Sequence, residues 1–378
     1  MPNKKLSSKI SLKNDSKARN GKVEFLRFLF CFIVLLYHIA ESTIGLKYEV
    51  LENITFFGKG YFSVEFFFIV SGYLMASTAF KNQENGLQLA ADTLSFMKRK
   101  LMAVLSYHLI VFSVTFLGVV ILNSFTITDI VKRFVDSLPN LLLIQRSGLY
   151  NVDVLGVEWY ISDMLMAMFI LYPICKRYYH NFTKIIAPII SLLIVGYLIK
   201  ETGKLSGSTA WSMLVSKTLL RAIAEICAGA ALFEIARYLK KLNLSKVDKT
   251  ILTILEVGSY LAVIGYIVVP SSRKYDGTFL IFMCIGICLS FAQVTYGNRI
   301  FNNKICLFLG KITLPIYLCQ SLVRRLTTGY IYETYGFVVC LVVSVIGTFA
   351  FAFISMFIEK YLRKFIDNKL EQISMKKQ

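Results

Sequence analysis

The chain has 378 residues, of which 56% are hydrophobic and only 17% are charged. A water-soluble protein of this length needs a larger polar surface, so the composition excludes a soluble globular domain and predicts a polytopic membrane protein. Lysine and arginine outnumber aspartate and glutamate by 42 to 23, which gives a formal net charge of +19. We attribute this excess to membrane topology and contact with anionic lipid, and we expect no nucleic-acid partner.

Apolar segments of about 18 to 26 residues recur along the chain, long enough to cross the hydrocarbon core of a bilayer as helices. They predict an all-α fold with about ten transmembrane helices, at 24–43, 60–80, 101–122, 157–176, 182–200, 213–238, 251–270, 277–294, 304–327 and 335–358. This predicted transmembrane domain covers 23–358. We expect 1–22 to be a disordered basic tail and 359–378 to be a second tail.

Clusters of lysine and arginine flank alternate segments, which predicts the orientation of the chain. They lie at 4–22, 98–100, 176–184, 237–249, 299–304 and 360–364. Cytoplasmic loops carry this excess of cations, so both termini are predicted to be cytoplasmic. The expected location is the cell membrane, as a multi-pass protein of the bacterial cytoplasmic membrane. The eight cysteines are scattered singly, without the spacing of a metal site, and favour packing over zinc or disulfides.

Two ionisable residues, Arg27 and His38, lie in the first apolar segment. On a helix, their separation of eleven residues returns to within about 20° of the same face after a rise of ~16 Å. Charged and polar side chains are costly in hydrocarbon, so both are predicted to face a polar interior. Arg27 is expected near the cytoplasmic end of the helix and His38 in its outer half.

Glu65 lies in the second segment, which enters the membrane from the outer side. Depth counting puts Glu65 and His38 both about 7 Å below the outer boundary, so we expect the two side chains to pair. A carboxylate partner fixes the tautomer of an imidazole and raises its basicity, as a general base requires. In the alternative interpretation, Glu65 neutralises a neighbouring arginine.

More polar residues are predicted on the outer side. Glu158, Trp159 and Tyr160 open the fourth segment, and Gln320 lies late in the ninth. The two aromatic residues fit either a substrate platform or an interfacial belt that anchors the helix.

Two other features favour structural roles at least as much as functional ones. Arg221 and Glu225 have the i, i+4 spacing of a helical ion pair, which we interpret as more structural than catalytic. His108, inside the third segment, fits a donor-site lining and a structural hydrogen bond about equally.

Four segments together resemble the acyltransferase 3 family, the multi-spanning membrane O-acyltransferases that modify bacterial surface glycans. The spacing of Arg27 and His38 matches the first-helix motif of that family. The segment FSVEFFFIVSGYL at 62–74 resembles its second-helix motif, which usually has aspartate in place of Glu65. The segments EWYIS at 158–162 and LGKITLPIYLCQ at 309–320 resemble later motifs of the family. The resemblance covers about 22–358.

The chain departs from the family pattern at two positions. Gln320 occupies the place where many members have a second histidine, so His38 is expected to carry proton transfer alone. Before the third segment, Arg99 and Lys100 are kept, but Ser106 stands where the family often has proline.

The resemblance implies an acyl-CoA donor on the cytoplasmic face and a hydroxyl acceptor on the outer side. The residues then expected at the donor site are Arg27, Arg99, Lys100 and His108. Those expected at the acceptor site are Glu158, Trp159, Tyr160 and Gln320. The catalytic set is expected to be His38, Glu65 and Arg27.

The function predicted in this way is O-acylation of an envelope glycan or glycolipid, with a short acyl group, most simply acetyl. Acetyl-CoA or another short acyl-CoA is the expected co-substrate, and no permanently bound cofactor or metal is expected. The alternative is a proton-coupled secondary transporter or flippase of an envelope precursor, in which Arg27, His38 and Glu65 form a proton relay. A non-catalytic scaffold fits less well, because buried polar groups are costly in a membrane.

Overall fold

The computed structural model describes residues 19–43, 58–81, 88–205, 210–212, 214–269 and 272–376, with side chains described as far as 365. Most of the predicted tail at 1–22 therefore lies outside the described residues. Helices dominate the described part, and two short antiparallel strands, β1 (Trp211–Ser212) and β2 (Val215–Ser216), precede one of them. The prediction of an all-α polytopic membrane protein is confirmed.

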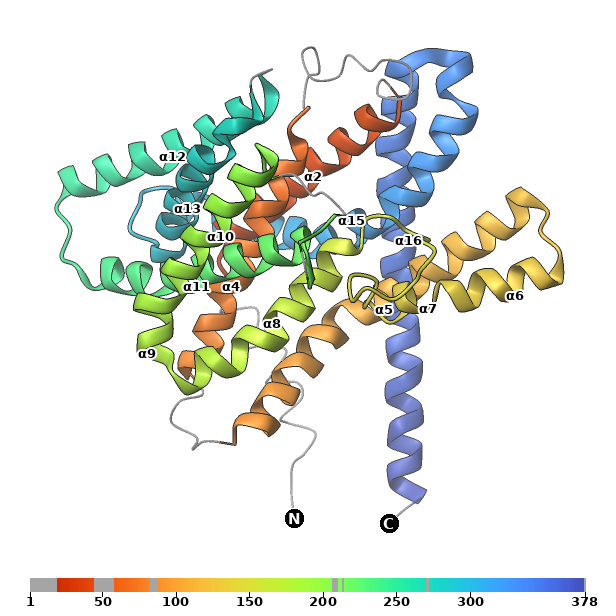
Figure 1. The fold of residues 1–378 in the computed structure, drawn as a ribbon, viewed down its shortest axis with the longest axis horizontal. Helices are drawn as coiled ribbons and strands as arrows, with labels where there is room; N and C mark the ends of the chain where they lie inside the picture. The colour runs from red at the N-terminus through yellow and green to blue at the C-terminus, as the bar shows by residue number, and fades with distance from the viewer. Residues whose placement is uncertain are drawn as a thin grey trace.

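Each of the ten predicted segments corresponds to a long helix of the described chain (Figure 1). Their bounds are α2 (Gly21–Thr43), α4 (Ser63–Lys81), α5 (Leu89–Asn123), α8 (Trp159–Arg177), α10 (Ala187–Thr202), α11 (Lys217–Lys241), α12 (Lys246–Val268), α13 (Asp276–Ala292), α15 (Lys304–Tyr330) and α16 (Tyr332–Lys376). The shorter elements are η1 (Gly60–Phe62), α6 (Ile127–Asp136), α7 (Leu138–Leu141), α9 (Tyr179–Asn181), η3 (Phe182–Ile186), η4 (Arg273–Tyr275) and α14 (Asn298–Phe301).

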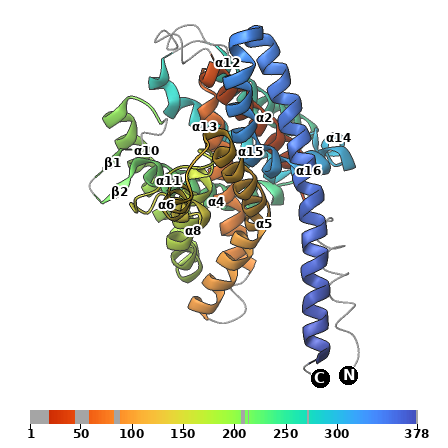
Figure 2. The same ribbon diagram turned by 90° about the vertical axis from the view of Figure 1, so that its right-hand side faces the viewer.

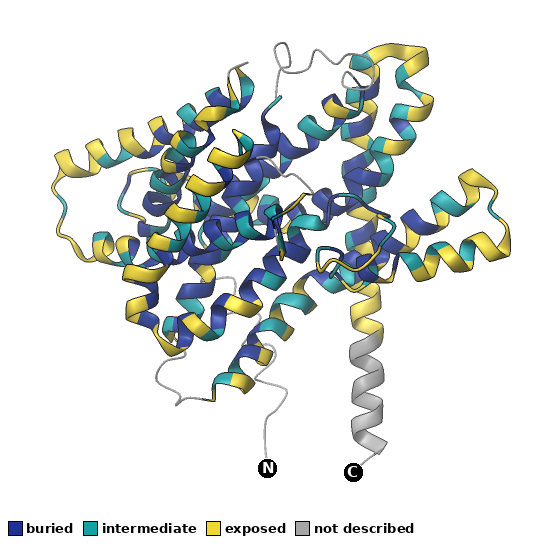
Figure 3. Ribbon diagram, in the orientation of Figure 1, coloured by how far each residue is buried: buried dark blue, intermediate teal, exposed yellow. Residues whose placement is uncertain are grey.

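Eight of these helical segments are long and apolar enough to cross a membrane by themselves. Helices α8 and α11 fall outside that set, and each carries a buried ionisable residue one turn after its start, Asp163 in α8 and Arg221 in α11. Both pack against α4 and against each other in the interior. Figure 3 shows this burial, with exposed residues concentrated on the peripheral helices. The polar residues of α8 and α11 are therefore surrounded by protein and not by lipid, as charged groups inside a membrane normally are.

Helices α4 and α11 approach so closely that their backbones are in contact. A side-chain carbon added at Gly72 of α4 would overlap the carbonyl of Ile226, and one added at Gly229 of α11 would overlap the carbonyl of Ile69. Each helix thus presents a glycine to the backbone of the other, as small residues do in membrane helix pairs. This close approach brings the charged residues of α11 to α4.

Helices α2 and α15 run side by side in the same direction. Gly310 faces Glu24 near the start of both helices, and the Cys31 thiol lies 3.4 Å from the carbonyl oxygen of Thr313. Near their ends, Arg324 donates a hydrogen bond to Ser42. Gln320, one turn before Arg324, therefore lies at the level of His38, one turn before Ser42.

A helical hairpin projects from the body of the molecule, and its second helix lies outside the predicted spans (Figure 1). It is formed by the end of α5 and by α6, and Ser124 in the left-handed conformation separates them. Thr126 and Asp129 form a capping box that begins α6. Helix α6 exposes apolar side chains such as Ile127 and Val131, as a helix lying at a membrane surface does.

Helix α16 is longer than the predicted tenth span. It contains one non-helical residue, Gly336, and then continues beyond 358 to Lys376 without a break in helical structure. Figures 1 and 2 show its second half extending past the other helices. The boundary predicted at 358 is therefore not marked by a helix end.

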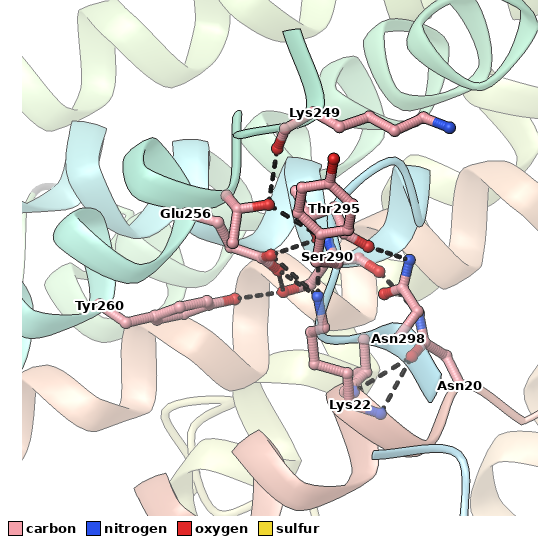
Figure 4. A network of polar contacts seen from close by, with 11 residues as sticks. Asn20, Lys22, Lys249, Glu256, Tyr260, Ser290, Thr295 and Asn298 are labelled. Carbon is pink, nitrogen blue, oxygen red and sulfur yellow. Dashed lines mark hydrogen bonds and ion pairs between the residues drawn. The ribbon is translucent and has the colours of Figure 1, made fainter. Parts of the chain in front are cut away.

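A buried polar network ties α2 to α12 and α13 (Figure 4). The Lys22 ammonium group donates to both carboxylate oxygens of Glu256, at 3.0 and 2.8 Å, and to Thr295 at 2.8 Å. Ser290 also donates to Glu256 at 2.6 Å, and it lies 3.0 Å from the hydroxyl of Tyr260. The buried ammonium and carboxylate groups thus satisfy each other, as buried charges require.

Candidate functional site

His38 lies near the end of α2, and its carboxylate partner comes from the same helix. Its Nδ1 is 3.3 Å from Oε2 of Glu41, and its side chain is 20% exposed. Tyr37 donates to the other oxygen of Glu41 at 3.0 Å. The predicted pair of His38 with Glu65 is wrong, because the nearer carboxylate is one helical turn further along α2.

Glu65 is instead part of a charged triad that we define as Glu65, Arg221 and Glu225. Arg221 donates from Nε to Glu65 at 2.9 Å and to Glu225 at 3.3 Å, and one terminal nitrogen also donates to Glu65. The side chains of both glutamates are fully buried, and that of Arg221 is 2% exposed. These contacts agree with the alternative interpretation, in which Glu65 neutralises a neighbouring arginine. A fully buried carboxylate takes a guanidinium because bidentate charged hydrogen bonds offset its desolvation.

Tyr37 connects the His38 region with the charged triad. Its ring lies 6.3 Å from that of Tyr61, whose carbonyl oxygen accepts a hydrogen bond from Arg221. The hydroxyl of Tyr37 also lies within electrostatic range of Arg221. His38 and Glu65 thus belong to one polar region, although they do not touch.

Helix α15 brings two polar side chains to the same end of α2. Arg324 lies within electrostatic range of Glu41, and its Nε has no hydrogen-bond partner within the described chain. Gln320 is 1% exposed, donates to the carbonyl of Tyr317 at 2.9 Å, and leaves its side-chain oxygen without a partner. Gln320 therefore lies in the predicted region, at the level of His38.

Arg27 lies toward the start of α2, on the side of the membrane domain away from His38. Its guanidinium forms an ion pair with Glu24 at 3.2 Å, and its side chain is 33% exposed. It acts electrostatically on Lys100 of α5 and on Tyr160 of α8. Arg27 and Lys100 therefore lie within electrostatic range of each other, whereas Arg99 is exposed and donates to Ser95 at 2.6 Å.

Of the two roles considered for His108, a donor-site lining and a structural hydrogen bond, its contacts fit the second. It is fully buried on α5, and its Nε2 lies 3.2 Å from the carbonyl oxygen of Leu141 in α7. Its ring also lies 5.9 Å from that of Phe112. No described contact joins His108 to Arg27 or Lys100, because α7 covers this part of α5.

The start of α8 supplies the three predicted acceptor-side residues. Glu158 is fully buried, and one of its oxygens accepts from the backbone of Val157 at 3.1 Å, while the other has no partner in the described structure. Trp159 lies under two guanidinium groups, those of Arg146 at 6.0 Å and Arg221 at 5.8 Å. Trp159 thus contacts the charged region. A tryptophan that only anchors a helix at the membrane interface has no such contacts.

Tyr160 faces inward, between the Arg27 side and the His38 side. Its ring lies 4.5 Å from that of Phe68 and 6.0 Å from that of Tyr317. Its hydroxyl and that of Ser71 both approach the sulfur of Met164, at 3.5 and 3.3 Å. Tyr160 thus packs among aromatic side chains of α4 and α15.

Buried polar atoms without a hydrogen-bond partner are concentrated around these residues. In the described part of the chain they include atoms of Ser63, Glu158, Ser162, Glu225, Gln320 and Arg324. The carboxylate of Asp163 lies beside the hydroxyl of Thr218 and within electrostatic range of Arg146 and Arg221. Buried polar groups in proteins normally have partners, so such a concentration marks a place where water or a polar ligand binds.

Sequence reasoning placed Arg324 in the outer zone with Gln320, but it did not assign Glu41 or Arg146 to the site. Glu41 was recognisable from its i, i+3 spacing to His38, because the predicted first segment already extended to residue 43. Arg146 lies in the segment between α7 and α8, and no helical periodicity predicts its contact with Trp159. Across the described residues, no group of three or more His, Cys, Asp or Glu has a metal-binding arrangement.

A helical membrane domain with ionisable groups buried at two levels defines an integral membrane protein with an internal polar site. The chain matches the family model described as an acyltransferase domain (acyltransferase 3) over residues 20–357, and it belongs to this family. It is therefore a membrane acyltransferase. No curated protein and no solved structure matches the chain.

Proposed function

We propose that this membrane acyltransferase transfers a short acyl group, most simply acetyl, from acyl-CoA to a hydroxyl of an envelope glycan or glycolipid. The observation that carries the proposal is the pair of His38 and Glu41 beside Arg324 and a set of unpartnered buried polar atoms. An imidazole held by a carboxylate, next to a cation and open polar groups, has the parts needed for hydroxyl activation.

His38 acts as the general base in this proposal. With its Nδ1–H directed at Glu41, its Nε2 is the free acceptor that removes the proton of the acceptor hydroxyl. The resulting oxygen attacks the thioester carbonyl, and Arg324 stabilises the tetrahedral oxyanion. Collapse of this intermediate breaks the carbon–sulfur bond, forms the ester, and returns the proton from His38 to the thiolate of CoA.

Arg27 and Lys100 bind the donor at the opposite end of α2. The lysine and the guanidinium lie within electrostatic range of each other, and Arg27 is a third exposed, so both cations suit phosphate groups of CoA. The rise from Arg27 to His38 is ~16 Å, which an extended thioester arm has to cover. We propose that the Arg27 end faces the cytoplasm, as the distribution of cations along the chain favours.

The acceptor occupies the region bounded by Trp159, Asp163 and Gln320. Carboxylate and amide oxygens there accept hydrogen bonds from sugar hydroxyls, and the indole offers a face for the sugar ring. This role extends to Glu158 and Tyr160, which lie on either side of Trp159 in the sequence.

The proposal is tested with membranes that contain the protein, radiolabelled acetyl-CoA and the isolated envelope glycan fraction. We expect His38→Ala to abolish incorporation of label into glycan, while the exposed His180→Ala, its matched control, leaves it unchanged. Both variants are first checked for an unchanged thermal unfolding midpoint. Label incorporation that survives in His38→Ala contradicts the assigned base. Failure of the wild-type protein to incorporate label from any short acyl-CoA contradicts the proposed donor.

A further inference from the structure

A long apolar groove lies between α10 and α12, and its described lining includes none of the residues assigned to the proposed reaction. Its volume is about 850 Å³, which is within the range of ligand pockets. Most of its lining comes from α10, α11 and α13, and α12 contributes Leu252 and Leu255. These four helices are close to one another in Figure 1.

The groove is lined by one stripe of each helix. On α10 the stripe includes Val195 and Gly196, and on α11 it includes Ala228, Ala231 and Ile235, which are spaced by three or four residues. Small residues at these positions leave the space that larger side chains occupy elsewhere. Because α10 and α12 are membrane-spanning by length and composition, this space adjoins the hydrocarbon of the bilayer.

The length of the groove suits an extended hydrocarbon chain. On α13 the lining runs from Gly277 to Leu289, a rise of ~18 Å, whereas one leaflet of the hydrocarbon core is about 15 Å thick. A chain that enters the groove from one face therefore reaches its full depth within about one leaflet. Water is excluded, because the lining offers it few polar partners.

A single cation lies at one end of the groove among its described lining residues. This is Lys274, an exposed residue in η4 directly before α13 begins. A lysine at the rim of an apolar groove attracts an anionic headgroup whose tail lies inside. We propose that the groove binds an anionic phospholipid, with one acyl chain between α10 and α12 and the phosphate at Lys274.

This lipid site lies behind the charged triad. Cys284 lines the groove, and its thiol is within electrostatic range of both Glu225 and Glu65. A chain in the groove packs against the face of α11 that carries Ala228, Ala231 and Ile235, and it shields this side of the triad from the bilayer. The proposal concerns binding of lipid and does not depend on the acyl donor or acceptor.

Gly196 and Gly258 provide a matched pair of substitutions. An added side-chain carbon meets nothing within 4 Å at either residue, but only Gly196 lines the groove. Gly196→Leu fills the groove without a clash, and Gly258→Leu adds the same apolar side chain elsewhere on a membrane helix. Native mass spectrometry of the full chain, extracted from vesicles of phosphatidylglycerol and phosphatidylcholine, counts the lipid that stays bound.

We expect wild-type protein and Gly258→Leu to retain one phosphatidylglycerol, and Gly196→Leu to lose it by about tenfold or more in affinity. Lys274→Gln is expected to bind phosphatidylglycerol and phosphatidylcholine alike, whereas the exposed Lys200→Gln keeps the preference for the anionic lipid. Equal retention by the two leucine variants overturns the site. A preference that survives in Lys274→Gln overturns the headgroup contact, and displacement of phosphatidylglycerol by an equimolar polyprenyl phosphate assigns the groove to that carrier instead.

Discussion

Arg221 holds both oxygens of Glu65 with two of its nitrogens, at a point where neither side chain is more than 2% exposed. The same guanidinium also binds Glu225. One cation thus serves two carboxylates inside the membrane domain, and α4 and α11 are joined at this point. Removing it leaves two buried acids without their main partner.

We therefore predict that Arg221→Met destabilises the protein by about 3 to 5 kcal/mol, the usual cost of leaving a buried charge unpaired. The free energy of unfolding is measured in detergent by denaturant titration. Arg363→Met, which removes an ion pair with Glu359 from a 63% exposed arginine, is the control and is expected to cost less than about 1 kcal/mol. Equal effects of the two substitutions contradict this account of the triad.

Glu41 is predicted to position His38. Its replacement by glutamine is expected to lower kcat by about tenfold to a hundredfold and to leave KM for both substrates unchanged, because the carboxylate orients the base without touching substrate. Glu41→Asp is expected to restore part of the rate. The control is Glu201→Gln, which removes a carboxylate of similar exposure, 51% against 50%, that pairs with Lys217. A change in KM without a change in kcat argues for a binding role of Glu41 instead.

The contact between α4 and α11 gives a third prediction. Gly72→Ala and Gly229→Ala each place a methyl group against the backbone of the other helix, so each is expected to cost about 1 to 3 kcal/mol or more through overpacking. Gly258→Ala meets open space and is expected to be neutral or to stabilise its helix by up to about 1 kcal/mol. Thermal unfolding midpoints of the three variants distinguish these outcomes, and a stable Gly72→Ala protein rules out the close packing.

Most of the fold was predictable from hydropathy, because a membrane helix has to be long and apolar regardless of its neighbours. The ten predicted segments all correspond to helices, including the one at 182–200. Helix α6 was not predicted, because its apolar residues are spaced for a surface helix and are interrupted by charge. The continuation of α16 beyond 358 was also missed, since a charged helix outside the membrane has no hydropathy signal.

The candidate site was predictable as a set of residues but not as a set of pairs. Depth along a helix is fixed by the rise per residue, so the levels of Arg27 and His38 followed from counting. Rotation of each helix about its axis depends on packing, which counting does not supply. Glu65 was therefore assigned to the histidine at its depth, whereas the close glycine contact of α4 with α11 turns it toward Arg221.

Lys22 and Lys176 belong to the cation clusters that predicted the orientation of the chain, yet both are neutralised inside the folded protein. Lys22 pairs with Glu256, and Lys176 pairs with Asp92, and neither lysine is more than 5% exposed. Topology is decided while the chain inserts, before helices far apart in sequence have met. With the predicted orientation, we expect these two lysines to keep their loops on one side of the membrane during insertion, and in the folded protein they join helices through Glu256 and Asp92. A substitution of either lysine therefore tests both the orientation of the inserted chain and the stability of the folded protein. The yield of correctly oriented chains separates these two effects.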